Sequence, residues 1–170
     1  MKCREDNITQ EYLKSILDYD PETGIFKWRV RKAHCIQIGD IAGTKDSSGY
    51  VIISIDNILY KAHRLAFLYI NGWLPEQVDH INVHDSKSDN KICNLRKATE
   101  SQNQHNRIKY KNNKSGYKGV TWHKATEKWM AAIKINKKSV YLGLFSDPQE
   151  AAEAYKQAAI QLHGEYARVN

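Results

Sequence analysis

The chain has 170 residues, of which 41% are hydrophobic and 26% are charged. This length holds one ordinary domain or two small ones, and this composition is typical of a folded protein rather than a disordered one. No stretch approaches the roughly 18 apolar residues that a membrane span needs, and the polar first residues do not resemble a secretory signal, so we expect a cytoplasmic protein that does not bind membranes.

Positive charge is concentrated in one part of the chain. Residues 105–138 contain ten Lys or Arg against one acidic residue, a net charge of +9. The other segments together contain 16 Lys or Arg against 18 acidic residues. Such a basic segment is typical of a protein that binds a polyanion, although a solvated basic face is the alternative.

The chain has three cysteines, Cys3, Cys35 and Cys93, at wide spacings. An odd number of cysteines without a C-x-x-C pair argues against a disulfide framework and against a zinc site. We therefore expect reduced thiols and no structural zinc.

The first part of the chain is predicted to begin with a helix and to continue as a small antiparallel sheet. Thr9 is a helix N-cap, apolar residues follow it at helical spacing, and the turn-forming segment 20–24 is expected to end that helix. Residues 24–62 contain short β-rich runs, two of which are separated by a hairpin turn at Asp56 and Asn57.

A buried helix and two short strands are predicted next. Residues 63–73 have the apolar density of a short buried helix that ends near Gly72. Strands are expected at residues 78–81 and 95–98, on either side of a polar, turn-forming segment. Thr99 begins a further helix with a capping-box sequence.

The remainder of the chain forms a second predicted module. Residues 108–115 are a basic linker without apolar period, and residues 116–170 contain three strand-like runs followed by an alanine-rich helix that starts at Ser146-Asp147-Pro148 and ends at Gly164. The fold class is therefore α+β. We expect domains at residues 1–107 and 116–170, with the second built as a three-stranded antiparallel sheet packed on one C-terminal helix.

Four polar residues of the first module occur in an order that suits metal-assisted hydrolysis. Asp79 and His80 are adjacent on a predicted strand, Asn94 is expected on the second strand, and Asn103 lies in the first turn of the following helix. Oxygens of Asp79 and Asn103 are hard ligands for Mg²⁺ or Mn²⁺. His80 is the candidate general base, and Asn94 is expected to fix its ring by a hydrogen bond. Taken singly, each residue has a structural alternative, such as a surface pair or a turn position.

The segment VDHIN, followed by NKICNLRKATESQNQHN, resembles the HNH motif of the ββα-metal nucleases, most closely that of HNH homing endonucleases carried by phages. The resemblance extends upstream through YDPETGIFKW and GTKDSSGYVIISI and covers roughly residues 10–107. It implies that His80 is the general base, that Asn94 orients it, and that Asp79 and Asn103 bind the metal. It also implies a gene of phage or mobile-element origin that is expressed in a bacterial host. Asn103 stands where many nucleases of this superfamily have histidine.

Two further residues of the first module are candidates for phosphate contact. His63 and Arg64 come directly before the apolar run of the predicted buried helix. A cation at this position would stabilise phosphate charge in the cleft. The alternative is a structural role for both residues.

The predicted strands of the second module interleave cations and aromatic residues. Alternation predicts one face that packs on the helix and consists of Val120, Trp129, Ala131, Ile133 and Leu142. The other face is expected to enter the major groove of double-stranded DNA. Its candidate contacts are Lys118, Thr121, Trp122, Lys124, Lys134, Lys138 and Tyr141. The alternative is that the aromatic residues all belong to the core.

The string from SGYKGVTWHKATEKW to EYARVN is similar to the APETALA-type, or ethylene-response-factor, DNA-binding domain over residues 115–170. This resemblance implies a three-stranded sheet that lies in the major groove. Lys118, Lys134 and Tyr141 occupy positions that the family often fills with Arg or Trp, which is a departure in the contact surface.

The two resemblances together predict a site-specific, divalent-metal-dependent DNA endonuclease. The first rival is a sequence-specific DNA-binding regulator with an inactive nuclease module. The second is an RNA-binding protein that stacks single-stranded bases on its aromatic residues. The sequence leaves the oligomeric state open, and a monomer is compatible with it.

Overall fold

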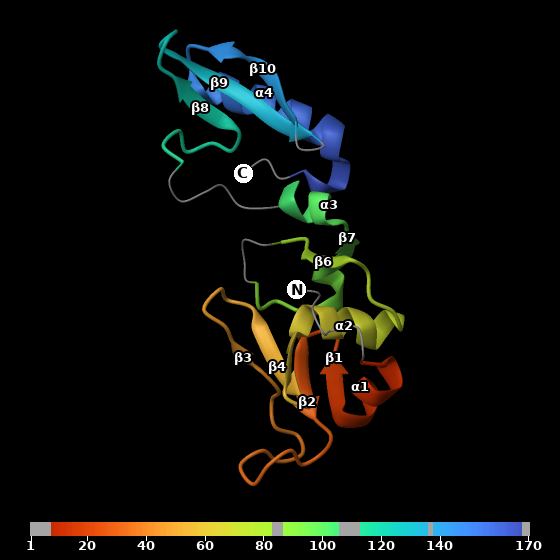
Figure 1. Ribbon diagram of the computed structural model, residues 1–170. Coiled ribbons are helices and arrows are strands. Elements are labelled where there is room, and N and C mark those ends of the chain that lie inside the picture. The colour runs from red at the N-terminus through yellow and green to blue at the C-terminus, as the bar shows by residue number, and fades with distance from the viewer. Residues whose placement is uncertain (1–7, 83–86, 106–112, 136–137, 168–170) are drawn as a thin grey trace. The chain divides into compact units, whose positions relative to one another are not determined.

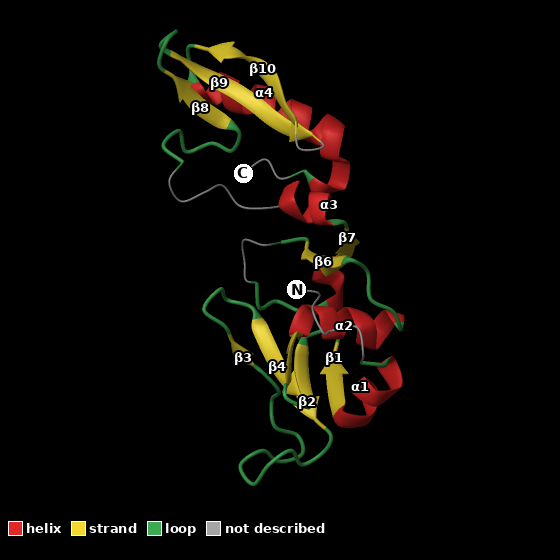
Figure 2. Ribbon diagram, viewed as in Figure 1, coloured by secondary structure: helices red, strands yellow, loops and turns green. Residues whose placement is uncertain are grey.

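The structure is a computed structural model that describes residues 8–82, 87–105, 113–135 and 138–167 (Figure 1). The chain divides into two compact units, Met1–Thr99 and Glu100–Asn170. Both units combine helices with small antiparallel sheets (Figure 2). Among the described residues, no helix is long and apolar enough to span a bilayer. Part of the predicted linker, up to residue 112, lies outside the described residues.

The first unit begins with α1 (Gln10–Ile16), which passes directly into β1 (Leu17–Asp20). The Thr9 hydroxyl accepts a hydrogen bond from the backbone N–H of Tyr12 at 3.2 Å, so Thr9 is the predicted N-cap. β1 pairs with β2 (Ile25–Trp28) in an antiparallel hairpin. The segment 20–24 is the turn of this hairpin, and our prediction that it ends the helix is wrong, because the chain becomes extended already at Leu17.

A second sheet follows, with strand order β3-β4-β5. Its strands are β3 (Thr44–Lys45), β4 (Val51–Ile55) and β5 (Ile58–Lys61). Asp56 and Asn57 connect β4 to β5 with φ angles of 51° and 63°, which confirms the predicted two-residue hairpin turn. The single sheet expected over residues 24–62 is therefore two sheets, since β2 joins the following segment through an isolated bridge between Lys27 and Ile41 and does not pair with β3, β4 or β5.

Helix α2 (Ala62–Asn71) begins immediately after β5 and confirms the predicted buried helix. Gly72 ends it with a φ of 77°, in the left-handed region that favours glycine. Leu65 and Ala66 are almost completely buried, because α2 contacts β4, β5, β6 and β7. The helix thus connects the N-terminal sheets with the strands that carry the predicted chemistry.

The last elements of the first unit are β6 (Gln77–His80), the 3-10 turn η2 (Ile92–Asn94) and β7 (Leu95–Ala98). β6 and β7 pair antiparallel, which confirms the two predicted strands. Their register sets Asp79 opposite Arg96 and His80 opposite Leu95.

The second unit contains α3 (Glu100–His105), followed by a three-stranded antiparallel sheet of order β10-β9-β8. The strands are β8 (Val120–His123), β9 (Lys128–Ile135) and β10 (Lys138–Phe145), and they precede α4 (Pro148–His163) and the short turn η3 (Gly164–Tyr166). Asp147 caps α4 by accepting a hydrogen bond from the N–H of Gln149 at 2.6 Å. These bounds confirm the predicted start of the helix, with Pro148 in its first turn.

Helix α4 packs on one face of this sheet. Ala151, Tyr155 and Ala159 recur every four residues and are buried against β9 and its neighbours. A Cβ atom at Gly119 would lie 2.0 Å from the Tyr155 ring, and Gly119 has a φ of +73°, so only glycine lets the ring close over the strand. The predicted helix-facing set is confirmed, and its members are Val120, Ala131 and Ile133, which are buried, and Trp129 and Leu142, which pack against them.

Candidate active site

Asp79 and His80 lie at the end of β6 and are both buried, with exposed fractions of 3% and 4%. Arg96 faces Asp79 across the strand pair and donates to its Oδ2 atom from Nε at 3.0 Å and from Nη2 at 2.9 Å. A buried carboxylate is costly without a partner, and this charge-assisted pair fixes the Asp79 side chain. The β6–β7 register therefore creates the first part of the site.

The His80 ring contacts the side chain of Asn90, with 3.3 Å between His80 Nε2 and Asn90 Oδ1. Burial lowers the pKa of His80 below its usual value of 6.5, and the hydrogen bond with Asn90 and the charges of Asp79 and Asp89 oppose this shift. The imidazole is therefore neutral at physiological pH, as a general base must be.

Asn90 is held by the β1–β2 hairpin. The Tyr19 hydroxyl donates to the backbone carbonyl of Asn90 at 2.7 Å. At Gly24, in the turn of the hairpin, a Cβ atom would lie 2.6 Å from the Asn90 carbonyl carbon, so glycine permits the close approach. Two segments that are about 70 residues apart thus position the side chain that contacts His80.

Asn94 has a different role from the one that we expected. Its Oδ1 atom accepts from the backbone N–H of Asn82 at 2.8 Å, and its Nδ2 atom donates to the Asp89 carbonyl at 3.1 Å. Its own carbonyl accepts from the N–H of Ile81 at 2.8 Å. Asn94 therefore joins the two ends of the loop between β6 and β7, and the hydrogen bond to the His80 ring comes from Asn90 instead.

A second histidine packs against the first. His63, in the first turn of α2, has its ring centroid 4.9 Å from that of His80, with the two rings inclined at 62°. Burial, followed by the charges of His80, Lys61 and Arg64, lowers the pKa of His63 well below 6.5. His63 is therefore neutral and does not bring the cation that we expected there. Arg64 donates from Nη1 to the Glu76 carbonyl at 3.3 Å.

A tyrosine and two lysines complete this cluster. The Tyr50 ring centroid lies 5.4 Å from that of His63 and 6.1 Å from that of His80. Lys61 Nζ lies 4.8 Å from the centre of the Tyr50 ring, and Lys87 Nζ lies 5.1 Å from it. Sequence reasoning missed Tyr50, Lys61 and Lys87. The position of Lys61 two residues before His63 was the one available signal.

The predicted metal ligands lie in different units. Asp79 belongs to the first unit, and Asn103 lies half-buried on α3 in the second. Their convergence on one ion therefore stays a prediction. Among the described residues, no group of three or more His, Cys, Asp or Glu is placed to hold a metal ion. A carboxylate and an amide oxygen are nevertheless ligands that suit Mg²⁺.

Three of the predicted DNA contacts share the sheet face that points away from α4. Thr121, Lys134 and Tyr141 are exposed, and they alternate with the helix-facing residues of their strands. Tyr141 is 59% exposed. This face therefore presents a hydroxyl, an ammonium and an aromatic ring, and the side chains of α4 do not cover it.

The other predicted contacts lie elsewhere. Trp122 pairs with Trp129, and Lys138 pairs with Ile135, so the register assigns both to the side of the sheet that faces α4. Trp122 still has 48% of its surface exposed and contacts the Trp129 ring at a centroid distance of 5.0 Å. Lys118 is half-buried before β8, and Lys124 is exposed just after it.

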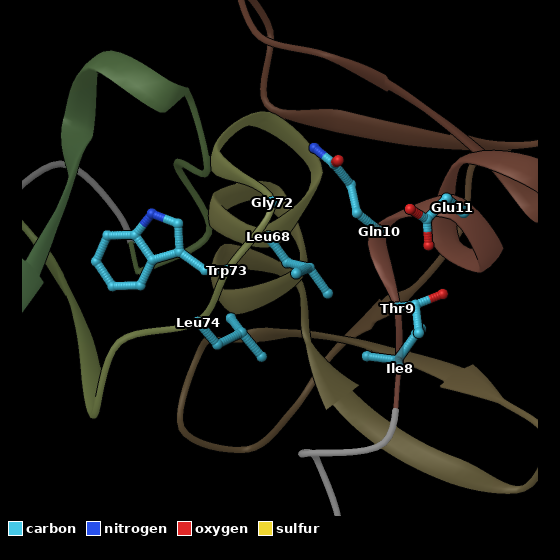
Figure 3. Close-up of a pocket in the computed structure, with 8 residues that line it drawn as sticks. All are labelled: Ile8, Thr9, Gln10, Glu11, Leu68, Gly72, Trp73 and Leu74. Atoms are coloured by element: carbon cyan, nitrogen blue, oxygen red, sulfur yellow. The ribbon is translucent and has the colours of Figure 1, made fainter.

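A pocket of about 420 Å³ lies apart from these residues, at the C-terminal end of α2 (Figure 3). Gln10 and Glu11 from α1 stand on one side of it, and Trp73 and Leu74 follow the end of α2 on the other. His63 lies at the opposite end of α2, about 13 Å of helix away. The pocket contains no predicted site residue.

In the comparison with known proteins, two segments of the chain match two different protein families. Residues 60–105 match the HNH endonuclease family, and residues 115–165 match the AP2 domain family. The HNH match includes β6, β7 and α3, and the AP2 match includes the sheet β8–β10 and α4. These matches support a nuclease module followed by a DNA-binding domain.

Curated relatives match the second unit. The AP2-like ethylene-responsive transcription factor AIL5 of Arabidopsis thaliana is 47% identical over 58 residues, which are 33% of this chain and 10% of that protein. APETALA2-like protein 2 of Oryza sativa is 43% identical over 56 residues, which are 33% of this chain and 13% of that protein. The chain thus spans about a tenth of the length of these relatives. No solved structure matches the chain.

Proposed function

We propose that the protein is a site-specific DNA endonuclease that depends on a divalent metal ion. The observation that carries this proposal is the buried, neutral His80 beside Asp79, within residues that match the HNH endonuclease family. The AP2 domain match supports a second unit that provides affinity for double-stranded DNA.

His80 is the general base in this mechanism. Asn90 Oδ1 beside Nε2 favours the tautomer in which Nε2 carries the proton, so that Nδ1 takes a proton from the attacking water. The resulting hydroxide attacks phosphorus, the bond from phosphorus to the 3′ oxygen breaks, and that oxygen takes a proton from solvent. The products carry 5′-phosphate and 3′-hydroxyl ends, as the HNH resemblance implies.

Asp79 and Asn103 are the residues that would hold the metal ion. When bound, Mg²⁺ or Mn²⁺ supplies Lewis-acid stabilisation of the charge that develops on the phosphate oxygens. The two hydrogen bonds from Arg96 keep the Asp79 carboxylate in one orientation for this purpose.

The outer face of the second unit is the proposed DNA contact. Thr121, Lys134 and Tyr141 offer a hydrogen-bonding group, a cation and an aromatic ring on a three-stranded sheet, which fits the major groove. Lys124, exposed at the end of β8, extends the positive charge toward the phosphate backbone.

The proposal is tested by incubating the full chain with a randomised library of long duplexes and Mg²⁺ or Mn²⁺, with EDTA in parallel. We expect cleavage in the metal-containing tubes alone, and sequenced ends that share one target and carry 5′-phosphates. Intact DNA in every tube would overturn the proposal.

The rival function is a DNA-binding regulator with an inactive nuclease module. The comparison with AIL5 favours it in one respect, because that relative is named as a transcription factor. The pairing of Asp79 with Arg96 also occupies one carboxylate oxygen that a metal would use. The same incubation separates the two functions, since a regulator binds the library and leaves it whole.

A further inference from the structure

Two lysines share one aromatic ring beside the candidate base. Lys61 Nζ and Lys87 Nζ both lie about 5 Å from the centre of the Tyr50 ring, and this ring also contacts the two buried histidines. Lys87 comes from the loop between β6 and β7, whereas Lys61 ends β5. Segments far apart in the sequence thus bring two ammonium groups to the same aromatic ring of the first unit.

Among the described residues, no acidic side chain forms an ion pair with Lys61 or Lys87. Lys87 donates a hydrogen bond to the Ser48 carbonyl at 3.1 Å. Asp46, on the hairpin that carries Tyr50, accepts from the backbone N–H groups of Ser48 and Tyr50. Two like charges that contact one ring repel each other, and a bound anion would offset this repulsion.

The start of α2 adds positive potential at the same place. Lys61 is the N-cap residue of this ten-residue helix and makes no side-chain capping hydrogen bond, and the first turn contains no acidic residue. The N–H groups and the helix dipole at such an end attract anions. In the same turn, His63 is 5% exposed, and its Nδ1 atom has no hydrogen-bond partner among the described residues.

We propose that Lys61, Lys87 and the first turn of α2 form a binding site for a DNA backbone phosphate. The Tyr50 ring connects this site to His80, so a phosphate held here keeps the neighbouring phosphodiester beside the base. The assignment of this phosphate to a cleaved strand rests on the proposed endonuclease function. The lysines are binding residues, and the chemical step is left to His80.

The test compares two double variants of the full chain that remove the same number of charges. K61Q/K87Q removes the proposed phosphate contacts. K14Q/K32Q is the matched control, because Lys14 lies over the Tyr69 ring at 5.2 Å and Lys32 over the Trp28 ring at 5.5 Å in the same unit. Binding to a target duplex is measured in EDTA over a range of salt concentrations, and thermal unfolding checks that both variants fold.

We expect K61Q/K87Q to reduce the slope of log affinity against log salt by about 0.9, since the neutralisation of one phosphate contributes about 0.9. The control is expected to change the slope by less than about 0.5. An unchanged slope in K61Q/K87Q, or an equal change in both variants, would overturn the phosphate site. At constant ionic strength, inorganic phosphate should compete with DNA for wild type and not for K61Q/K87Q, because the free ion would occupy the same site; equal competition in both would overturn the assignment to these lysines.

Cleavage in Mg²⁺ is measured in parallel, so that the two proposals fail separately. If wild type cleaves and the slope of K61Q/K87Q is unchanged, the phosphate site is wrong and the endonuclease stands. If wild type does not cleave and the slope falls, the endonuclease is wrong and the phosphate site stands. If both are right, K61Q/K87Q should also cleave at least about 10-fold more slowly at limiting protein, because the phosphodiester is held less well.

Discussion

The two units use their polar residues in opposite ways. In the first unit Asp79, His80 and His63 are almost completely buried, and their contacts come from strands, a loop and a helix. In the second unit Thr121, Lys134 and Tyr141 are exposed on the sheet face that points away from α4. Buried groups give defined orientation and shifted pKa values, whereas exposed groups give affinity that is spread over several contacts. Single substitutions should therefore have large, coupled effects in the first unit and graded effects in the second.

The largest effect is expected at Asp79. D79A removes the carboxylate that receives two hydrogen bonds from Arg96, whose side chain is 12% exposed. We expect a loss of about 2 to 4 kcal/mol in the free energy of unfolding of the first unit, together with loss of cleavage. Chemical denaturation followed by Trp28 and Trp73 fluorescence measures the first effect. Wild-type stability in D79A would mean that the buried pair does not support the unit.

The corresponding change in the second unit is Gly119→Ala. The new Cβ atom would meet the Tyr155 ring, and the positive φ adds strain, so we expect the second unit to lose about 2 to 3 kcal/mol. DNA affinity should fall as this unit unfolds, while the fold of the first unit is retained, as hydrogen exchange of β6 and β7 would reveal. Equal loss of protection in both units would show that they do not fold independently.

A smaller effect is expected at Asn90. N90A removes the hydrogen bond that raises the pKa of His80 against the effect of burial, so the pKa of His80 should fall further. The base then stays neutral to lower pH, and the acidic limb of the pH–rate profile moves to lower pH. We also expect the maximal rate to fall about 10-fold, because the ring loses its orientation.

Asn94 offers the contrast to this variant. N94A removes hydrogen bonds to backbone groups of the loop and not to the ring. It should lower the free energy of unfolding by about 1 to 3 kcal/mol without moving the acidic limb. A shift of that limb in N94A and not in N90A would reverse the roles of the two asparagines.

The smallest effects compare two lysines on opposite sides of the second sheet. Lys134 lies on the outer face with Tyr141, whereas Lys138 pairs with Ile135 on the side of α4. K134Q should reduce the salt slope of binding by about 0.9, and K138Q by clearly less. A larger change in K138Q than in K134Q would mean that the face toward α4 contacts DNA, as the sequence predicted for Lys138 and Trp122.

Local patterns predicted much of the fold. The hairpin turn at Asp56 and Asn57, the end of α2 at Gly72 and the start of α4 at Pro148 each depend on a few neighbouring residues, and each is found where we expected it. The helix-facing residues of the second sheet followed from alternation alone. The end of the first helix was predicted too late, because the burial of Leu17 suits either a helix or a strand.

The contacts around His80 could not be predicted in the same way. Asn90 and Asn94 lie in a polar loop without periodicity, and only the packing of that loop on the β1–β2 hairpin decides which of them reaches the ring. Tyr50 contacts the His63 ring and Lys87 lies over the Tyr50 ring, and no spacing in the sequence links these three residues. Trp122 was assigned to the outer face because a shift of one residue in register exchanges the faces of a strand.

The central claim is that His80 performs the chemistry and leaves binding to other residues. Its most direct test is single-turnover cleavage of one target duplex by wild type and by H80A, at protein concentrations that bind all of the DNA, with H34A as a control at an exposed histidine. We predict Mg²⁺-dependent cleavage by wild type and H34A, and a rate at least about 10²-fold lower in H80A with unchanged affinity. Cleavage by H80A at the wild-type rate, or an intact duplex in every reaction, would contradict this account.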